Sequence, residues 1–257
     1  LDVAALTDHD HWGMQFLDEH PAMWERSVAA ARAADRLGRF LALPGYEWTS
    51  WLTGHRHVLF FGDVTPLCSS MDERFETPEK LRAALRGLDA LIVPHHPAGG
   101  PIAIDWRIAP DAELEPLVEV CSAHGQSESL EAPRSIYSAR PGHFARDALE
   151  RGYRLGFVGS GDTHDGHPGL ASMGPHYPTG GLAAILSEDL TRESVLDALR
   201  KRRVYATSGP RILLRFALGS ARMGETVRAS DLGAGASLFV QVAATAPLTS
   251  IEIVMRG

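Results

Sequence analysis

The 257-residue sequence has only two cysteines, Cys68 and Cys121, and they stand in unlike contexts. Two isolated thiols do not form a disulfide framework, so we expect a reducing compartment and assign the chain by default to the cytoplasm. No apolar run approaches the roughly 20 residues that a membrane-spanning helix needs, so a membrane is not an expected partner. The sequence also lacks a GxSxG, a Walker A and a Rossmann glycine pattern, so these signals of common enzyme classes are missing.

Positive charge is not in excess either. The chain has 25 basic and 32 acidic residues, which gives a formal net charge of −7. This balance argues against nucleic acid or an anionic membrane as the main partner, and a small molecule is the expected partner. The hydrophobic content of 44% is that of a globular protein with a full core. No pattern in the sequence indicates an oligomeric state.

Histidine, by contrast, is abundant, with 12 residues. The positions of these residues matter more than their number, because scattered surface histidines would not form clusters. Nine of them lie in or beside short polar clusters: His9, His11, His55, His57, His95, His96, His124, His164 and His167.

Short apolar runs alternate with amphipathic segments along the first 210 residues. The apolar runs predict strands, and the segments with three- and four-residue apolar spacing predict helices. Such alternation is typical of an α/β fold with a parallel sheet or barrel and right-handed crossovers. The predicted strands are Val3–Leu6, Phe40–Tyr46, Val58–Phe61, Ala90–Val93, Leu117–Cys121 and Leu155–Val158. The predicted helices are Ala22–Leu37, one starting at Thr77 and Pro78, Pro141–Gly152 and Thr191–Arg203.

The end of the chain has a different pattern. Residues 168–181 are rich in glycine and proline and predict a loop. From Arg211 onward, β-branched and apolar runs alternate with glycine turns, which predicts a small β-rich, sandwich-like segment whose last strand is SIEIVM. We therefore expect two domains, residues 1–210 and residues 211–257.

Polar residues follow several of the predicted strands. The strand at Leu155–Val158 runs into Asp162 and His164, which are two positions apart, so on an extended chain both side chains point the same way. In α/β folds the carboxyl ends of strands are where sites are built. Four other strand ends carry the same residue types: Asp8 and His9, Glu47, His95 and His96, and Glu119 and His124.

Some of these clusters leave alternatives open. His55 and His57 have the same facing on a strand, so either can be a ligand. His95 and His96 are adjacent, so only one is expected to face inward while the other supports it or lies on the surface. Glu119 lies inside an apolar strand and needs a polar partner, which is either a metal or a histidine.

Three other residues have competing interpretations. His124 contacts substrate or metal, or simply caps the chain. Arg56 is a candidate for binding an anionic group, and a surface position fits it equally well. Cys121 is expected to be a small core residue rather than a ligand or nucleophile.

The donor set itself indicates a type of chemistry. Histidine, aspartate and glutamate without cysteine pairs suit Zn, Mn or Fe in a hydrolytic site. Such a site binds a water, lowers its pKa and directs the hydroxide at a phosphorus or carbonyl centre. For any single cluster the alternative is a polar loop whose aspartate turns the backbone. Five strand ends with the same residue types favour the metal site.

Six segments together resemble the PHP (polymerase and histidinol phosphatase) superfamily and, more narrowly, its DUF3604 group. The segments are ALTDHD (Ala5–Asp10), GYEWTS (Gly45–Ser50), GHRHVLFF (Gly54–Phe61), LIVPHHP (Leu91–Pro97), VEVCSAHGQSE (Val118–Glu128) and GSGDTHDGHPG (Gly159–Gly169). In addition, RRVYATSGPRI (Arg202–Ile212) looks like the element that closes that domain. The resemblance covers about positions 1 to 212.

This resemblance implies a distorted (β/α)7 barrel that holds two or three divalent metal ions and hydrolyses phosphoesters. Carried over by motif, the metal ligands are His9, Glu47, His55 or His57, His95 or His96, Asp162 and His164. Asp8 then lies beside them as ligand support or proton acceptor. We assign catalytic roles to Asp8 and His124, and substrate binding to Arg56 and His124.

One part of the family's pattern is missing from the sequence. The first motif of the superfamily is a pair of histidines on the first strand, and it would lie upstream of Leu1. The chain begins without a methionine, so we expect it to be a fragment of a longer product. An H-x-H pair roughly 20 to 30 residues before Leu1 would complete the site, a distance that fits one strand, loop and helix.

Three functions follow from these observations. The leading hypothesis is a metal-dependent hydrolase of a phosphoester with metal-bound hydroxide as nucleophile. The second is an amidohydrolase-like hydrolysis of a non-phosphate bond, because the same cluster activates water for either reaction. The third is a non-catalytic metal-binding module with a regulatory role, a hypothesis that the missing first motif keeps open.

Overall fold

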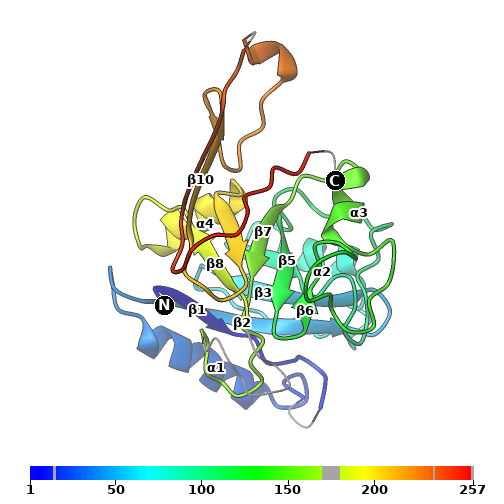
Figure 1. Ribbon diagram of the computed structural model, residues 1–257. Coiled ribbons are helices and arrows are strands. Elements are labelled where there is room, and N and C mark those ends of the chain that lie inside the picture. Colours follow the sequence, from blue (N-terminus) through cyan, green and yellow to red (C-terminus); the bar gives the residue numbers. More distant parts are fainter. Residues whose placement is uncertain (14–15, 170–179, 234, 256–257) are drawn as a thin grey trace.

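The computed structural model describes residues 1–13, 16–169, 180–233 and 235–255. Within these ranges the chain forms four α-helices, one short 3-10 helix and twelve strands in several small sheets (Figure 1). The helices are α1 (Pro21–Ala34), α2 (Pro78–Leu85), α3 (Ala145–Glu150), α4 (Arg192–Arg200) and the 3-10 helix η1 (Ala229–Asp231). The strands are β1 (Val3–Leu6), β2 (Leu41–Ser50), β3 (Gly54–Phe60), β4 (Ala90–Pro94), β5 (Leu117–Ser122), β6 (Gly125–Gln126), β7 (Gly156–Gly159), β8 (Leu182–Ile185), β9 (Val204–Thr207), β10 (Leu213–Leu218), β11 (Ala221–Arg222) and β12 (Leu238–Ala243).

The largest sheet has the order β1-β2-β3-β4. β1 pairs in parallel with β2, and β2 pairs in antiparallel fashion with β3, which in turn is antiparallel to β4. The connection between β2 and β3 is the turn at residues 51–53. A turn this short joins only antiparallel strands, because a parallel connection needs a crossover of a dozen or more residues.

The remaining strands form smaller sheets beside this one. β5 pairs in parallel with β7 and in antiparallel fashion with β6, and β8 is antiparallel to β9. β4 lies next to β5, and β7 lies next to β9, so the small sheets follow one another in space. His95 after β4 and Asp162 after β7 therefore lie close to Glu47 on β2, and the polar clusters of the sequence come together there.

The predicted distorted (β/α)7 barrel is wrong. The described strands form four separate small sheets and no closed barrel, and their parallel pairs are limited to β1–β2 and β5–β7. The alternation of apolar runs located the strands but not their directions. β3 runs antiparallel to both β2 and β4, because the tight turn after β2 reverses the chain and the connection after β3 reverses it again.

Most of the predicted elements are confirmed, with shorter helices than expected. Thr77 and Thr191, where two of the predicted helices begin, are the helix caps, and each accepts a hydrogen bond from the backbone N–H three residues further on. The predicted helix over 22–37 ends at Ala34, and Leu37 is exposed beyond it. No described helix is long and apolar enough to cross a bilayer.

The hydrophobic core packs against strand β2, whose ten residues are all buried. One group of core side chains includes Trp24, Tyr46 and Phe60, and another is built on Leu43 and Leu91. Each fully buried side chain of this size contributes about 1.5–3 kcal/mol. The strand that carries the central carboxylate of the candidate site is thus held from both sides by apolar packing.

Gly54 sets the path of the chain into β3. Its φ is +87°, and a Cβ there would lie 2.7 Å from Ile104 Cδ1 and 2.8 Å from Ile104 Cα. Glycine is therefore required at this corner both for the backbone conformation and for the space. The corner sets the start of β3 and thereby the positions of His55 and His57 on that strand.

The C-terminal region forms its own antiparallel sheet of order β11-β10-β12. In Figure 1 this sheet extends away from the part of the molecule that holds the other sheets. The predicted strand SIEIVM is wrong, since residues 250–255 have no strand assignment. The predicted loop at residues 168–181 lies mostly outside the described residues.

Candidate metal centre

Glu47 lies at the centre of a buried cluster of histidines. Its Oε1 atom is 2.7 Å from His55 Nδ1 and 3.7 Å from His9 Nδ1. Its Oε2 atom is 3.7 Å from His57 Nε2 and 4.0 Å from His95 Nε2. The register of the sheet explains this arrangement, because β2 and β3 place Glu47 opposite His57, and His9 forms an isolated parallel bridge with Glu47.

Both members of each ambiguous histidine pair lie in this cluster. The expectation that only one of His95 and His96 faces inward is wrong, since His96 Nε2 is 3.9 Å from Glu47 Oε1 and the two rings are 4.2 Å apart. The strand alternation stops at Pro94, where β4 ends, and His96 adopts a φ of +32°. The two-residue period of a strand therefore no longer separates the two side chains.

A second carboxylate, Asp162, extends the cluster. Its Oδ2 atom is 2.9 Å from His124 Nε2 and 3.3 Å from His95 Nε2, and its Oδ1 atom is 3.5 Å from His164 Nδ1. The pairing of Asp162 with His164 does not come from an extended chain. Their φ values are +50° and +56°, so a left-handed backbone brings the two side chains together.

Backbone strain is concentrated in this cluster. His96, Asp162 and His164 all have positive φ, and they are three of the six non-glycine residues with this conformation in the described ranges. Each such residue costs on the order of 1 kcal/mol and is retained where the surrounding structure and function require it. Half of the positive-φ residues other than glycine in the described ranges thus fall within this one cluster.

Glu119 supports His95 from behind. Its Oε2 atom is 2.7 Å from His95 Nδ1 and accepts a hydrogen bond from Ser160 Oγ, and Oε1 accepts the backbone N–H of His96. A carboxylate that holds one ring nitrogen fixes the tautomer and the orientation of the other. His95 Nε2 is thereby turned toward Glu47 and Asp162, so the histidine partner expected for Glu119 is present.

Asp10 holds the segment that carries His9, a role that the sequence reasoning missed. Its buried carboxylate accepts hydrogen bonds from the backbone N–H groups of His11, Thr49 and Ser70. Thr49 Oγ1 in turn lies 2.8 Å from His9 Nδ1. The sequence carried a signal for Thr49: it stands two residues after Glu47 on the same strand, so its side chain shares the face of Glu47.

Two predicted residues lie outside the cluster. Asp8 is exposed, and its backbone carbonyl accepts the N–H of Glu47. Arg56 is buried on the face of β3 opposite the histidines, where its Nε donates to Glu115 Oε1 over 3.1 Å and its guanidinium packs over the Trp48 ring. This position argues against substrate binding by Arg56 and for a structural role.

The electrostatics of the cluster depend on its two carboxylates. Burial by itself raises the pKa of Glu47, but His95, the hydrogen bond with His55 and the nearby His57 hold that pKa well below its usual value. Burial likewise opposes ionisation of Asp162, and His95 and His124 outweigh it and lower the pKa well below the usual value. Among the described residues, no arginine or lysine is paired with either carboxylate. The cluster therefore requires positive charge that its histidines or a bound cation must supply.

The histidine nitrogens fit a divalent metal. Burial, and then the positive charge of His95, hold the pKa of His96 well below its usual value, so its ring is neutral. His96 Nδ1 and His55 Nε2 are buried without a hydrogen-bond partner among the described residues. A buried polar atom without a partner costs about 1–3 kcal/mol, and a metal ligand bond removes that cost.

Four groups of three side chains bring their donor atoms within 4.8 Å of one another. Glu47 belongs to two of these groups. The groups are His9, Glu47 and His55; Glu47, His95 and His96; His57, His95 and Glu119; and His124, Asp162 and His164. Cys121 belongs to none of these groups; burial raises the pKa of its thiol to about 12, and Sγ donates to the carbonyl oxygen of Thr207.

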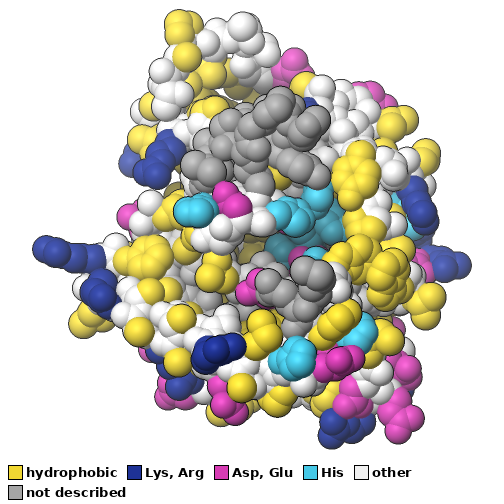
Figure 2. Space-filling view, turned by 90° about the horizontal axis from the view of Figure 1, so that it is seen from below, with side chains coloured by type: hydrophobic (Ala, Val, Ile, Leu, Met, Phe, Trp, Pro, Cys, Tyr) yellow, Lys and Arg dark blue, Asp and Glu magenta, His cyan; other side chains and the backbone are white. Residues whose placement is uncertain are grey.

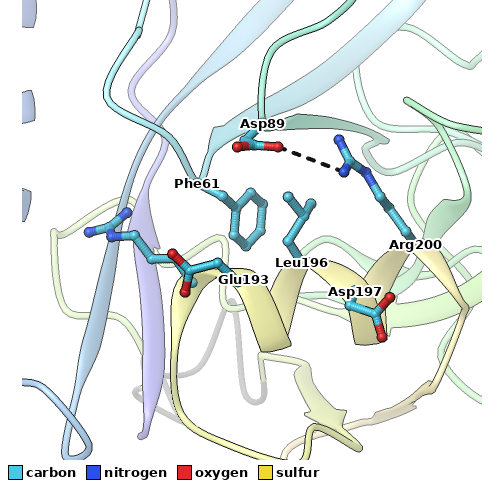
Figure 3. A pocket seen from close by; sticks show the side chains of 7 residues that line it. Phe61, Asp89, Glu193, Leu196, Asp197 and Arg200 are labelled. Atoms are coloured by element: carbon cyan, nitrogen blue, oxygen red, sulfur yellow. Dashed lines mark ion pairs between the residues drawn. The ribbon is translucent and has the colours of Figure 1, made fainter.

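Figure 2 shows histidine side chains gathered near the middle of one face of the molecule, with hydrophobic side chains beside them. A separate pocket next to α4 is lined by Phe61, Asp89, Leu196 and Arg200, among others (Figure 3). Asp89 and Arg200 are paired there over 3.8 Å. None of the candidate metal ligands lines that pocket, so the histidine cluster is the better candidate for chemistry.

Comparisons with known proteins relate the chain to proteins without an assigned activity. It is 28% identical over 250 residues to an uncharacterized protein of Chlamydia pneumoniae, covering 92% of this chain and 40% of that protein. It is 29% identical over 232 residues to an uncharacterized protein of Chlamydia muridarum, covering 85% of this chain and 37% of that protein. The chain therefore spans about two fifths of the length of these relatives.

A match to a protein family is confined to the C-terminal part of the chain. The family described as "Protein of unknown function (DUF3604)" matches residues 170–237, which lie beyond all the candidate ligands. No solved structure matches the chain significantly. The chain is thus similar to DUF3604 proteins over residues 170–237 and to the chlamydial proteins over most of its length, and neither similarity names a reaction.

Proposed function

We propose that this chain carries the centre of a metal-dependent hydrolase that cleaves phosphoesters. The observation that carries the proposal is the cluster around Glu47 and Asp162, in which histidine nitrogens surround two buried carboxylates that no described arginine or lysine neutralises. Histidine and carboxylate ligands without thiolates are those of hydrolytic zinc, manganese and iron sites. Motif resemblance to the PHP superfamily supports the same class of reaction.

The residues of the cluster divide into holding and positioning groups. His9, Glu47, His55, His57, His95, His96, Asp162 and His164 would hold two or three divalent ions. Glu119 and Asp10 orient them from outside through His95 and Thr49. A bound divalent metal would supply an acidified water and neutralise negative charge on the phosphoryl oxygens.

The reaction consumes one water for each ester bond. The water oxygen forms a bond to phosphorus, the bond between phosphorus and the ester oxygen breaks, and a water proton passes to the leaving oxygen. His124 lies at the more exposed end of the cluster, with Nε2 2.9 Å from Asp162 Oδ2, where it can hold a proton near the leaving group. Its catalytic and substrate-binding roles remain predictions.

The test combines metal analysis of the full-length protein with turnover of a generic phosphomonoester and a generic phosphodiester. We expect the purified protein to contain zinc, manganese or iron and to hydrolyse at least one of the two substrates. Asp162→Asn replaces a central carboxylate with a group of the same shape and should abolish turnover while the fold, followed by circular dichroism, is retained.

Asp165→Asn is the matched control. Asp165 lies three residues away on the same loop, is exposed, and accepts the N–H of His167, so its replacement should leave turnover unchanged. Full activity of a folded Asp162→Asn variant would overturn the proposal. Turnover of an amide but of neither phosphoester would replace it with the hydrolysis of a non-phosphate bond.

A further inference from the structure

The five tryptophans of the chain fall into two kinds. Trp24, Trp48 and Trp106 are buried, and each indole N–H donates to a backbone carbonyl oxygen, as a structural tryptophan does. Trp12 and Trp51 have no such hydrogen bond to any described residue, and Trp51 is 51% exposed. The two exceptions lie together, so they require a separate explanation.

Trp12 and Trp51 form a stacked pair at the edge of the histidine cluster. Their ring centroids are 4.1 Å apart and their planes differ by 19°. The Trp12 ring lies 5.6 Å from the rings of both His9 and His55, two of the candidate metal ligands. Ring contacts therefore lead from the candidate metal ligands to Trp12, and from Trp12 to the solvent-exposed Trp51.

The two tryptophans come from segments that are held in place by hydrogen bonds. Trp51 opens the turn after β2, and Ser50 Oγ accepts the backbone N–H groups of Leu52 and Thr53 at 3.3 and 3.1 Å. The segment before Trp12 is tied to the same strand, since the carboxylate of Asp10 accepts the N–H of Thr49. The pair is therefore preorganised, and a ligand that binds it loses little free energy to the ordering of these two segments.

We infer that the Trp12–Trp51 pair is the subsite that binds a planar aromatic group of the substrate next to the ester that is cleaved. This inference rests on the proposed function, because it assigns the phosphoryl end of the substrate to the histidine cluster. A nucleobase or an aryl ring attached to a phosphoester has the required shape, with a flat apolar group joined to an anionic one.

The chemistry of the rim supports an aromatic group over a sugar or a second anion. The two indole rings offer π-faces, on which nucleobases and aryl rings stack. Such stacking depends little on which base is bound or which substituents the ring carries. Among the described residues, no arginine or lysine is ion-paired with a member of the cluster. Loss of one aromatic stack weakens binding by roughly 5- to 150-fold.

The experiment compares substrates that differ only in the aromatic group. The kcat/KM of the metal-loaded full-length protein is measured for adenosine monophosphate, phenyl phosphate and ribose 5-phosphate. Trp51→Ala should lower kcat/KM for the first two by roughly 5- to 150-fold, mainly through KM, and leave ribose 5-phosphate unchanged. Preference for adenosine monophosphate over phenyl phosphate would identify the group as a nucleobase, and the reverse as a simple aryl ring.

A binding measurement makes the test independent of turnover. Adenosine is titrated into the metal-free protein, and quenching of tryptophan fluorescence gives its dissociation constant in the wild type and in each variant. Trp51→Phe keeps an aromatic ring and should retain most of the affinity. Leu52→Ala is the matched control, because Leu52 is the neighbouring exposed apolar residue on the same turn and offers no ring.

The outcomes separate this inference from the proposed function. Adenosine binding that depends on Trp51, without turnover of any phosphoester, would support the subsite and remove the hydrolase. Turnover of all three substrates with no effect of Trp51→Ala on their ratios, and adenosine affinity unchanged in that variant, would overturn the subsite and leave the hydrolase. An equal loss for Leu52→Ala and Trp51→Ala would also overturn it.

Discussion

The two faces of strand β3 hold charged groups in opposite ways. On one face, the guanidinium of Arg56 donates to Glu115 Oε1 and to the carbonyl oxygens of Thr53 and Gly54. Arg82 reaches the other oxygen of the same carboxylate. On this face each buried charge has an opposite charge beside it, which is what a structural ion cluster requires.

The opposite face of the same strand carries His55 and His57, and it leaves donor atoms unused. The histidines crowd around Glu47, ring centroids of His57 and His95 lie 4.0 Å apart, and His55 Nε2 is buried without a partner among the described residues. A folded protein tolerates such unpaired groups where a ligand takes them up. Buried charges that are paired thus indicate a structural role, and crowded histidine nitrogens without partners indicate a binding site.

Breaking the paired face should have the largest effect. Glu115→Gln keeps the shape of the side chain but leaves Arg56 and Arg82 without a counter-charge, and arginine cannot lose its proton to compensate. We expect a loss of about 3–5 kcal/mol in the free energy of unfolding. Urea unfolding in the presence of a chelator measures it.

The matched control on the other face is Glu47→Gln. The histidines around Glu47 can lose their protons, so the metal-free variant should lose less stability than Glu115→Gln does. An equal loss in the two variants would mean that the histidine cluster is as structural as the arginine cluster, and it would remove the contrast between the two faces.

The next largest effect should be the stability gained on metal binding, which should depend on the histidine face of β3. At a metal concentration 100 times the dissociation constant, the wild type should gain about 2.7 kcal/mol of stability, and EDTA should remove the gain. Glu47→Gln should lose most of this increment, because Glu47 belongs to two of the donor groups. Thermal unfolding with zinc or manganese and with EDTA measures it, and an unaltered gain in Glu47→Gln would place the metal elsewhere.

A smaller effect is expected behind the cluster. Glu119→Gln still accepts the Nδ1–H of His95 but lacks the negative charge that makes His95 a strong ligand. Metal affinity should fall by roughly 10- to 100-fold with little change in the metal-free fold. Competition with a chelator of known affinity gives the value, and Ser160→Ala, which removes only a hydrogen bond to the same carboxylate, should cost less.

The sequence predicted the facing of some residues and not of others for a simple reason. His55 and His57 lie inside a regular strand, where the two-residue period holds, so both face the cluster as their spacing indicates. His96, Asp162 and His164 lie beyond strand ends, and their positive φ values break that period. Local spacing determines side-chain direction only where the backbone is regular.

The roles predicted for Asp8 and Arg56 show that residue type and local spacing also do not determine which partners a side chain contacts. Asp8 and Asp10 are equivalent by residue type and by their two-residue spacing, yet Asp10 is buried in three backbone hydrogen bonds and Asp8 is exposed. Arg56 stands between two histidines in the sequence but lies on the opposite face of the sheet. There it forms an ion pair with Glu115, which is 59 residues away in the chain. Which partner a polar side chain finds is decided by distant segments.

The sequence by itself determined the residue types of the cluster, the positions of most strands and the starts of the helices at Thr77 and Thr191, because these depend on local patterning. The direction of the strands, the absence of a barrel among the described residues, and the pairing of Trp12 with Trp51 came only from the tertiary structure. Strand pairing and ring stacking join segments that are tens of residues apart. The energy that selects among such pairings lies in the packed core and the hydrogen-bonded turns, and no local spacing encodes it.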